Sequence, residues 1–345
     1  MIFQLLIVLA AIVIGARKGG IGLGVAGGLG LAVLTFGFGL RPTSPPIDVM
    51  LMIAAVIAAA SCMQAAGGLD LMVKWAERLL RRHPQHITLL SPLVTYLFTL
   101  LAGTGHVAYS ILPVIAEVAT ETKVRPERPL SIAVIASQQA ITASPISAAT
   151  VVLLSMLAGY DITLIDIMKI AIPCTMAGVL LGALYSMKIG KELADDPEYR
   201  RRLAEGAFKS KHRHTREVEN PRGALLSVVL FLVATVGIVI FGSSEALRPV
   251  FHTNEGTVPM QMSHIIEILM LSAAALMLIG TRTNGIRAVQ GSVFSAGMQA
   301  VIAIFGIAWM GDTFISGNMA ALKGGIEQYV TTMPWLFGLA LFIIV

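Results

Sequence analysis

The feature that most constrains this chain is its series of long apolar segments without charged residues. Several exceed the roughly 18 to 20 residues that a helix needs to cross a bilayer. Hydrophobic residues make up 56% of the chain and charged residues only 13%, against roughly a quarter charged in a soluble domain. This composition excludes a soluble enzyme and a nucleic-acid-binding protein. The apolar blocks lie at 1–16, 19–40, 47–66, 87–119, 130–158, 161–187, 223–242, 262–280, 293–311 and 335–345.

The interiors of these blocks lack the alternation of a membrane β-strand, so we expect an all-α polytopic membrane protein. The first block is followed, not preceded, by Arg17 and Lys18. It therefore predicts a retained membrane helix rather than a signal peptide. The last block, 335–345, is about half a span, so we expect the natural chain to continue beyond Val345.

Charge in the connections predicts the topology. The connections at 67–86 and 188–222 are basic, and the second carries ten Lys or Arg and seven Asp or Glu. We expect 188–222 to be a solvated cytoplasmic linker between an N-terminal membrane half, 1–187, and a partial C-terminal membrane half, 223–345. By the positive-inside rule both connections face the cytoplasm. Three apolar blocks separate them, so one of the three must fail to cross.

The block at 130–158 is the first choice for this exception. Pro145 has no N–H and disfavours helix at Ser144, so the helix should break there. Two short arms that meet at this break would form a re-entrant hairpin. A break within block 87–119 would also repair the topology and is the alternative.

Polar side chains gather around the predicted break, six within eleven residues. Broken helices at membrane depth are where secondary transporters bind solutes. Hydroxyl and amide donors without a fixed cation suit a carboxylate. The competing interpretation is a Ser/Thr-rich helix bent by proline and packed against its neighbours. The candidate substrate-binding residues are Ser137, Gln138, Gln139, Thr142, Ser144 and Ser147.

A second interruption, Gly103-Thr104-Gly105-His106, lies in block 87–119. Thr104 and His106 join the candidate binding residues, because a histidine near membrane depth can bond a carboxylate or carry a proton. Alternatively, the glycines allow close packing and His106 caps a neighbouring carbonyl. Asp312, at the end of block 293–311, is better explained as an interfacial residue.

Neither a metal site nor a cofactor is predicted. The GxGxxG string at 22–27 lies inside an apolar block, without the preceding strand that a dinucleotide site needs. Gly20, Gly24 and Gly28 instead predict a helix-packing face. The histidine pairs at 83 and 86 and at 212 and 214 lack the cysteines or carboxylates that would complete a metal site.

Five strings carry a resemblance that runs in order over essentially the whole chain. They are Gly67–Asp70, Ala102–His106, Arg125–Pro129, Ile141–Ser147 and Gly306–Met310. In these strings the chain resembles the anaerobic C4-dicarboxylate transporter (Dcu) family of bacterial inner membranes.

This resemblance implies a secondary transporter, not an enzyme, that exchanges fumarate, malate, aspartate and succinate during anaerobic growth. It also implies two inverted repeats, each with a hairpin, as in the ion-transporter superfamily. The partners would be dicarboxylate anions and the lipid bilayer; H⁺ or Na⁺ coupling and a homo-oligomer stay open. The alternative from another class is an intramembrane hydrolase that uses Ser110 and His106, although no oxyanion motif accompanies this pair.

Overall fold

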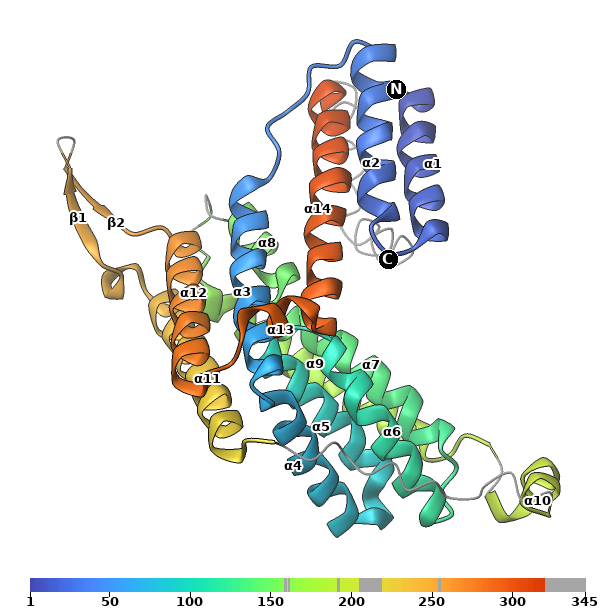
Figure 1. Cartoon of the computed structure of the whole chain (residues 1–345). Helices are drawn as coiled ribbons and strands as arrows, with labels where there is room; N and C mark the ends of the chain where they lie inside the picture. The colour runs from blue at the N-terminus through green and yellow to red at the C-terminus, as the bar shows by residue number, and fades with distance from the viewer. Residues whose placement is uncertain (158–159, 161, 191–192, 205–218, 254–255, 320–345) are drawn as a thin grey trace. The chain divides into compact units, whose positions relative to one another are not determined.

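The computed structural model describes residues 1–157, 160, 162–190, 193–204, 219–253 and 256–319 (Figure 1). Most of these residues are helical, which confirms the all-α fold. The chain divides into two compact units, one formed by Met1–Met50 with Ala296–Val345 and the other by Leu51–Ser295. Each unit is treated by itself below.

The first unit is a packed group of three apolar helices. The glycines of α2 allow its backbone to touch α14. A Cβ on Gly24 would lie 2.0 Å from the Ile302 carbonyl oxygen, and one on Gly27 would lie 2.5 Å from the Gly306 carbonyl carbon. Glycine packing by this helix is therefore present, but through Gly24 and Gly27. Gly28, which the sequence predicts to be part of the packing face, is not, because a Cβ there would meet nothing within 4 Å. The elements are α1 (Ile2–Lys18), α2 (Gly22–Ala32) with a π-helical turn at Val33–Gly37, and the larger part of α14 (Ser292–Gly317).

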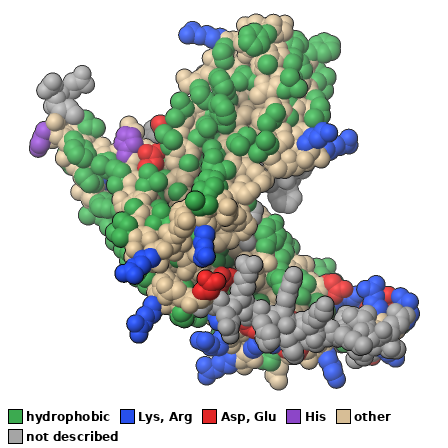
Figure 2. Space-filling view, viewed as in Figure 1, with side chains coloured by type: hydrophobic (Ala, Val, Ile, Leu, Met, Phe, Trp, Pro, Cys, Tyr) green, Lys and Arg blue, Asp and Glu red, His purple; other side chains and the backbone are tan. Residues whose placement is uncertain are grey.

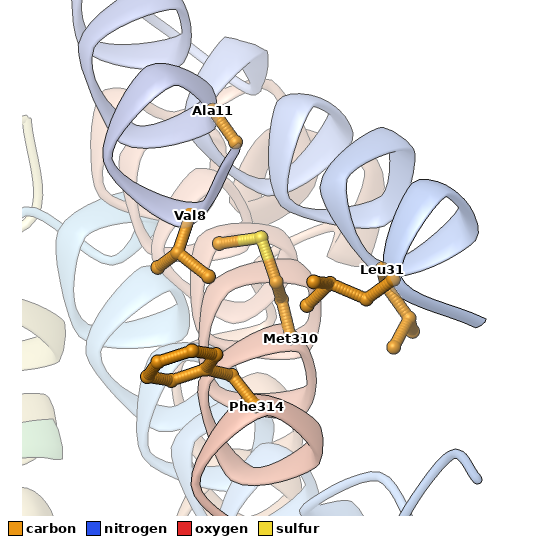
Figure 3. Packing of buried hydrophobic residues seen from close by; sticks show 6 residues of the cluster. Val8, Ala11, Leu31, Met310 and Phe314 are labelled. Atoms are coloured by element: carbon orange, nitrogen blue, oxygen red, sulfur yellow. The ribbon is translucent and has the colours of Figure 1, made fainter. Parts of the chain in front are cut away.

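Beside this glycine contact, larger side chains fill the space between the three helices. Met310 and Phe314 of α14 point towards Val8 and Ala11 of α1 and Leu31 of α2 (Figure 3). The Trp309 indole N–H donates to the Thr43 carbonyl, which ties the segment after α2 to α14.

The second unit contains the remaining helices and a two-stranded antiparallel ribbon. Its helices are α3 (Ile47–Ala65), α4 (Gly68–Arg82), α5 (Ile87–Ala102), α6 (His106–Glu121), α7 (Glu127–Ala143), α8 (Ala148–Met156), α9 (Leu164–Ser186), α10 (Pro197–Ala204), α11 (Pro221–Ser243), α12 (Met262–Thr281) and α13 (Gly285–Gln290). Short 3₁₀ turns lie at Pro84–His86, Leu193–Asp195 and Glu245–Leu247. The strands are β1 (Val250–Thr253) and β2 (Gly256–Pro259), with Phe251 opposite Val258.

Each apolar block up to residue 311 contains one or two of these helices, and the block at 335–345 lies outside the described residues. Within the part of the chain that the structure describes, six helical segments are long and apolar enough to cross a membrane: Ile47–Ala65, Pro84–Ala102, Leu164–Ser186, Pro221–Ser243, Met262–Thr281 and Ser292–Gly317. Hydrophobic side chains cover the outer surfaces of α11 and α12 (Figure 2). A soluble protein rarely exposes apolar patches of this extent, so these surfaces face lipid.

Helices α5 and α7 run side by side in the same direction. The Ser91 hydroxyl donates to the Pro129 carbonyl at 3.3 Å, and the Thr95 hydroxyl donates to the Ala133 carbonyl at 2.9 Å. One turn further on, the Thr99 and Ser137 hydroxyls are 2.8 Å apart. The sequence separation is 38 residues at every rung, and a constant separation requires parallel helices.

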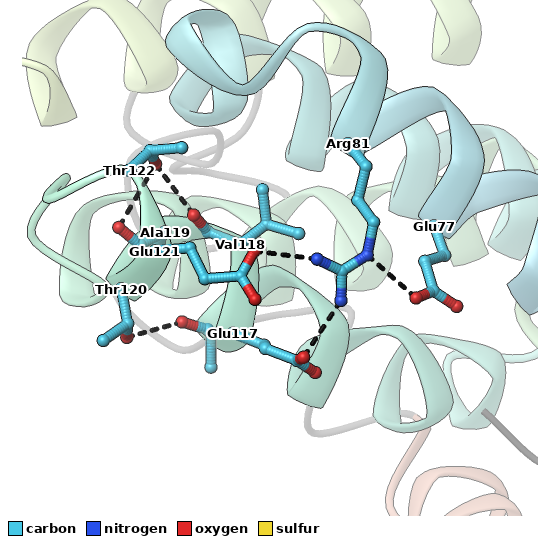
Figure 4. Close-up of polar contacts among 9 residues, drawn as sticks. Glu77, Arg81, Glu117, Val118, Ala119, Thr120, Glu121 and Thr122 are labelled. Atoms are coloured by element: carbon cyan, nitrogen blue, oxygen red, sulfur yellow. Dashed lines mark hydrogen bonds and ion pairs between the residues drawn. The ribbon is translucent and has the colours of Figure 1, made fainter. Parts of the chain in front are cut away.

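Helix α6 returns the chain to the side from which α5 started. Arg81 lies near the end of α4, shortly before α5 begins. Its guanidinium bonds Glu117 at 3.0 Å and Glu121 at 2.8 Å, both in the last turns of α6, as well as Glu77 of its own helix (Figure 4). The two ends of the segment 87–121 therefore lie together, and α5 and α6 form a helical hairpin.

This hairpin corrects the expectation that 130–158 folds back on itself. The predicted break is confirmed, since α7 ends at Ala143 and α8 begins at Ala148. However, α8 lies beyond the end of α7 rather than along it (Figure 1). The break consists of residues 144–147, in which Ser144 is extended, with φ −77° and ψ 129°, and the Ser147 N–H bonds the Ser144 carbonyl at 3.3 Å. The physical reason for the difference is that this extended residue and single turn together do not bring α8 back along α7.

Helix α9 closes this group by running antiparallel to α7. Arg128, in the first turn of α7, donates Nε to the Ile189 carbonyl at 2.7 Å and Nη2 to the Gly190 carbonyl at 2.9 Å. Both carbonyls directly follow the end of α9. With the hairpin at 87–121, the connection 67–86 and the start of the connection 188–222 fall on the same side, as the alternative break in block 87–119 requires.

The linker begins with a short helix. Asp196 caps this helix, because its carboxylate accepts the backbone N–H of Glu198 at 2.9 Å and of Tyr199 at 3.3 Å. These bonds, together with Arg125, hold the pKa of Asp196 below its usual value. Residues 205–218 of the linker lie outside the described residues, and the division into 1–187, 188–222 and 223–345 stays a prediction.

Candidate functional site

The two helix breaks of the second unit meet each other. A Cβ on Gly103 would lie 2.8 Å from the Ile146 Cγ1 atom and 3.1 Å from the Ile146 carbonyl oxygen. A Cβ on Gly105 would lie 3.2 Å from the Gln138 amide nitrogen and 3.4 Å from the Ser137 hydroxyl. The hairpin turn at 103–105 thus packs directly against the break between α7 and α8. Both interruptions predicted from the sequence contribute to one place.

Glycine is required at the hairpin turn for two reasons. Gly103 ends α5 in the left-handed conformation, with φ +69°, and its N–H bonds the Thr99 carbonyl at 2.9 Å. Left-handed backbone is disfavoured for residues that carry a Cβ. The contact with Ile146 leaves no space for a side chain in any case.

The three predicted serines are buried at the meeting point, and their hydroxyls bond backbone or other hydroxyls. Ser144 is 0% exposed and donates to the Leu100 carbonyl at 2.7 Å. Ser147 is 0% exposed, donates to the Ile141 carbonyl and accepts the Thr150 backbone N–H at 3.2 Å. Ser137 bonds Thr99 as described above. These hydroxyls satisfy backbone groups that the breaks leave without helical partners.

The predicted amides and one predicted hydroxyl have the opposite environment. Gln138, Gln139 and Thr142 are all exposed, on the last two turns of α7. The Gln138 amide reaches the hairpin turn beside Gly105. The Thr142 hydroxyl donates to the Gln139 carbonyl at 2.7 Å, which leaves its oxygen lone pairs available. These three side chains are accessible to a solute at the break.

Thr104 lies in the hairpin turn, and His106 is the first residue of α6. Thr104 is half-buried and takes part in a polar interaction, and the side chain of His106 lies outside the described residues. The backbone of His106 starts α6 at the meeting point, as Ala148 starts α8. Two helix N-termini therefore end at one place, and each carries partial positive charge and N–H groups without helical partners. An anion is favoured there.

Two buried threonines were not among the predicted site residues. Thr99 bonds Ser137, and the Thr150 hydroxyl donates to the Thr142 carbonyl at 3.2 Å, across the α7–α8 break. A sequence signal for the first was present. Ser91, Thr95 and Thr99 recur at four-residue spacing in an apolar block, which places all three on one helix face.

Asp312 and the pair Asp166 and Lys169 lie apart from these breaks along the chain. Asp312 is an exposed residue of α14. Lys169 lies 3.5 Å from Asp166 on α9, in the self-neutralised pair that their spacing allows. Asp166 also forms a capping box with Thr163 at the start of α9, which gives this carboxylate a structural role.

Comparison with known proteins identifies relatives over almost the whole chain. The chain is 45% identical over 349 residues to the C4-dicarboxylate transporter DcuA of Escherichia coli (strain K12), and the match covers 99% of this chain and 78% of that protein. DcuA of Wolinella succinogenes is 44% identical, with the same coverage. The anaerobic C4-dicarboxylate transporter DcuB of Escherichia coli O6:H1 is 39% identical, again with 99% and 78% coverage. No solved structure matches the chain.

The family described as "anaerobic C4-dicarboxylate membrane transporter" matches residues 1–345. Nothing in these relatives supports the hydrolase built on Ser110 and His106. The resemblance predicted from the five strings is thereby confirmed. The chain belongs to the anaerobic C4-dicarboxylate membrane transporter family and is a multi-pass secondary transporter of the bacterial inner membrane, not an enzyme.

Proposed function

We propose that this protein exchanges C4-dicarboxylates such as fumarate, malate, aspartate and succinate across the membrane, with the substrate bound where the two helix breaks meet. The observation that carries the proposal is the contact between Gly103 and Gly105 of the hairpin turn and Ile146 and Gln138 of the α7–α8 break. Paired helix breaks of this kind supply solutes with backbone groups that an unbroken helix keeps to itself.

The substrate carboxylates would be bound by groups that the structure leaves accessible. Gln138 and Gln139 offer amide N–H donors. The Thr142 hydroxyl would donate to a carboxylate by turning its proton away from the Gln139 carbonyl, which accepts it in this structure. Thr104 and His106 would contribute from the hairpin turn. The N-terminal ends of α6 and α8 add partial positive charge. Because this charge is smaller than that of a buried cation, the substrate would be bound less tightly and released faster.

Ser137, Ser144 and Ser147 would act in a different way. Their hydroxyls are buried and bond backbone carbonyls or other hydroxyls. They would hold the two breaks in shape so that the exposed donors are positioned. The serines would therefore affect substrate affinity indirectly, through the geometry of the break.

Counterflow in proteoliposomes tests the proposed exchange. Vesicles loaded with unlabelled succinate should accumulate labelled succinate, and external fumarate, malate or aspartate should compete with it. Glutarate, with five carbons, should compete poorly if the two carboxylates are bound at a fixed separation. Uptake that does not depend on internal dicarboxylate would contradict exchange.

Coupling to a cation is a separate part of the proposal. The same vesicles, assayed with and without a Na⁺ gradient and with and without a pH gradient, distinguish Na⁺ coupling, H⁺ coupling and electroneutral exchange without either. Crosslinking in the membrane at low protein density would show whether a homo-oligomer forms.

A further inference from the structure

Helix α4 has three distinct faces, and one of them is directed towards the core of its unit. The core-facing residues of α4 are all buried: Leu69, Met72, Val73, Ala76 and Leu80. A second face carries Arg81 and Glu77, which pair with each other and join α4 to α6. The third face carries apolar and basic side chains, several of them exposed.

This third face consists of two stripes at four-residue spacing. Leu71, Trp75 and Leu79 form an apolar stripe, in which Trp75 is 39% exposed and Leu79 43% exposed. Lys74, Arg78 and Arg82 form a basic stripe. In a helix of 3.6 residues per turn, these two stripes lie side by side, about 60° apart. We call this pair of stripes the α4 outer face.

The basic stripe of the α4 outer face differs from the other basic residue of its helix in its ion pairs. Among the described residues, no carboxylate pairs with Lys74, Arg78 or Arg82. The basic helix of the linker, α10, differs sharply in this respect. Its arginines pair with carboxylates of the linker: Arg201 and Arg202 lie 2.9 Å and 2.7 Å from Glu198, and Arg200 lies 4.0 Å from Asp195.

The α4 outer face also lies next to a membrane span. Only Ala66 and Gly67 separate the end of α3 from the start of α4. The span Ile47–Ala65 is 19 residues long, about the thickness of the hydrocarbon core, so α4 begins at the membrane–water interface. An apolar stripe with tryptophan beside a basic stripe suits this zone, where rings sit at the headgroup level and cations meet phosphates.

We propose that the α4 outer face binds anionic phospholipid headgroups. The Lys74, Arg78 and Arg82 side chains would contact the phosphates, and Leu71, Trp75 and Leu79 would enter the upper acyl region. Since α4 is also joined to the α5–α6 hairpin through Arg81, the bound lipid would hold the base of the hairpin at the interface. Charge complementarity and continuity with α3 favour lipid over a soluble partner.

Trp75 is a reporter inside the proposed site. The chain has three tryptophans, so Trp309→Phe and Trp335→Phe leave Trp75 alone. This variant is reconstituted into phosphatidylcholine vesicles that contain either brominated phosphatidylglycerol or brominated phosphatidylcholine as the quencher. We expect phosphatidylglycerol to quench Trp75 at far lower mole fractions. Equal quenching by both lipids would overturn the proposal.

Two charge-neutralising variants test whether the basic stripe is responsible. In the Lys74→Gln, Arg78→Gln, Arg82→Gln variant, the apparent affinity for phosphatidylglycerol should fall about a hundredfold, since each such side chain near an anionic surface is worth about fivefold. The matched control removes three arginines of α10, with Arg200→Gln, Arg201→Gln and Arg202→Gln. This control should keep the preference for phosphatidylglycerol. If both variants lose the preference, net charge and not the α4 outer face is responsible, and the proposal is overturned.

If the triple α4 variant fails to insert, a salt titration gives a second test. It uses protein in which Lys74, Arg78 and Arg82 are unchanged. Screening weakens exposed charge interactions strongly as ionic strength rises. The quenching preference for phosphatidylglycerol should therefore disappear at high salt, while labelled succinate exchange still reports a folded protein. A preference that is indifferent to salt would exclude the basic stripe as its source.

Discussion

The two helix breaks at the site are built from different residues and do different things to the chain. The break after α5 is a glycine turn, in which the left-handed Gly103 reverses direction and α6 returns beside α5. The break after α7 is a Ser-Pro segment, in which the extended Ser144 displaces the helix axis but lets the chain run on. A break in an apolar block therefore predicts irregular backbone. Whether the chain then reverses into a hairpin or continues in the same direction depends on the backbone conformation at the break.

The two breaks also differ in how their polar groups are satisfied. The Ser-Pro break is bonded by its own hydroxyls, from Ser144, Ser147 and Thr150. The glycine turn has fewer side-chain groups of its own and depends on α7, where Ser137 and Gln138 face it. Damage to the glycine turn should therefore disturb the site more than loss of one hydroxyl in the Ser-Pro break.

The largest effect is expected for Gly103→Ala. Left-handed backbone costs a residue with a Cβ roughly 1–2 kcal/mol, and the new methyl group would also meet Ile146 at 2.8 Å. Overpacking of this kind costs roughly 1–3 kcal/mol more. We expect loss of labelled succinate exchange and a lower unfolding temperature.

The matched control for this substitution is Gly178→Ala in α9, where a Cβ would meet nothing within 4 Å. Helix propensity favours alanine there, so exchange should be preserved. Normal succinate exchange in Gly103→Ala would show that substrate binding does not depend on the geometry of the glycine turn. The glycine turn would then be no more sensitive to substitution than the Ser-Pro break.

A smaller but still severe effect is expected for Pro145→Ala. The substitution restores an N–H and removes the restriction on Ser144, so α7 and α8 gain the option of joining. The exchange rate should fall more than the affinity, because the substrate donors remain while the break loses definition. Initial rates over a range of succinate concentrations separate the two; an affinity loss at constant maximal rate would contradict this role.

Gln138→Ala should change substrate affinity with little effect on stability. Its exposed amide lies beside Gly105, and a hydrogen bond to a charged group is worth roughly 1.5–3 kcal/mol. The apparent substrate constant should rise about tenfold or more. Gln138→Glu keeps the size but opposes the substrate charge, and should be worse than alanine. Unchanged competition by fumarate in both variants would remove Gln138 from the site.

Much of this organisation was predictable from the sequence, because hydrophobic length and proline act locally. The helix limits follow the apolar blocks, and the break at Ser144 follows from Pro145. The hairpin lies in block 87–119 and not in the block that the sequence favours, 130–158, because reversal depends on the φ of Gly103 and on which helices pair. That pairing rests on hydrogen bonds between residues 38 positions apart. Burial of Ser144 and exposure of Gln138 likewise depend on neighbours that a single sequence does not place.

The smallest effect is expected for Ser144→Ala, and it decides how the serines act. The Ser144 hydroxyl is fully buried and donates to the Leu100 carbonyl at 2.7 Å. Losing this bond should cost about 1 kcal/mol of stability, which lowers the unfolding temperature by roughly 1–2 °C for a chain of this size. Because the hydroxyl faces α5 and not the exposed side of α7, the apparent constant for succinate should stay within about twofold. Thermal unfolding and counterflow on one preparation give both quantities. A tenfold weaker affinity at unchanged stability would make Ser144 a substrate ligand, as its place in the sequence first indicated. The Ser-Pro break would then bind the substrate itself, and the contrast with the glycine turn would lie in backbone direction alone.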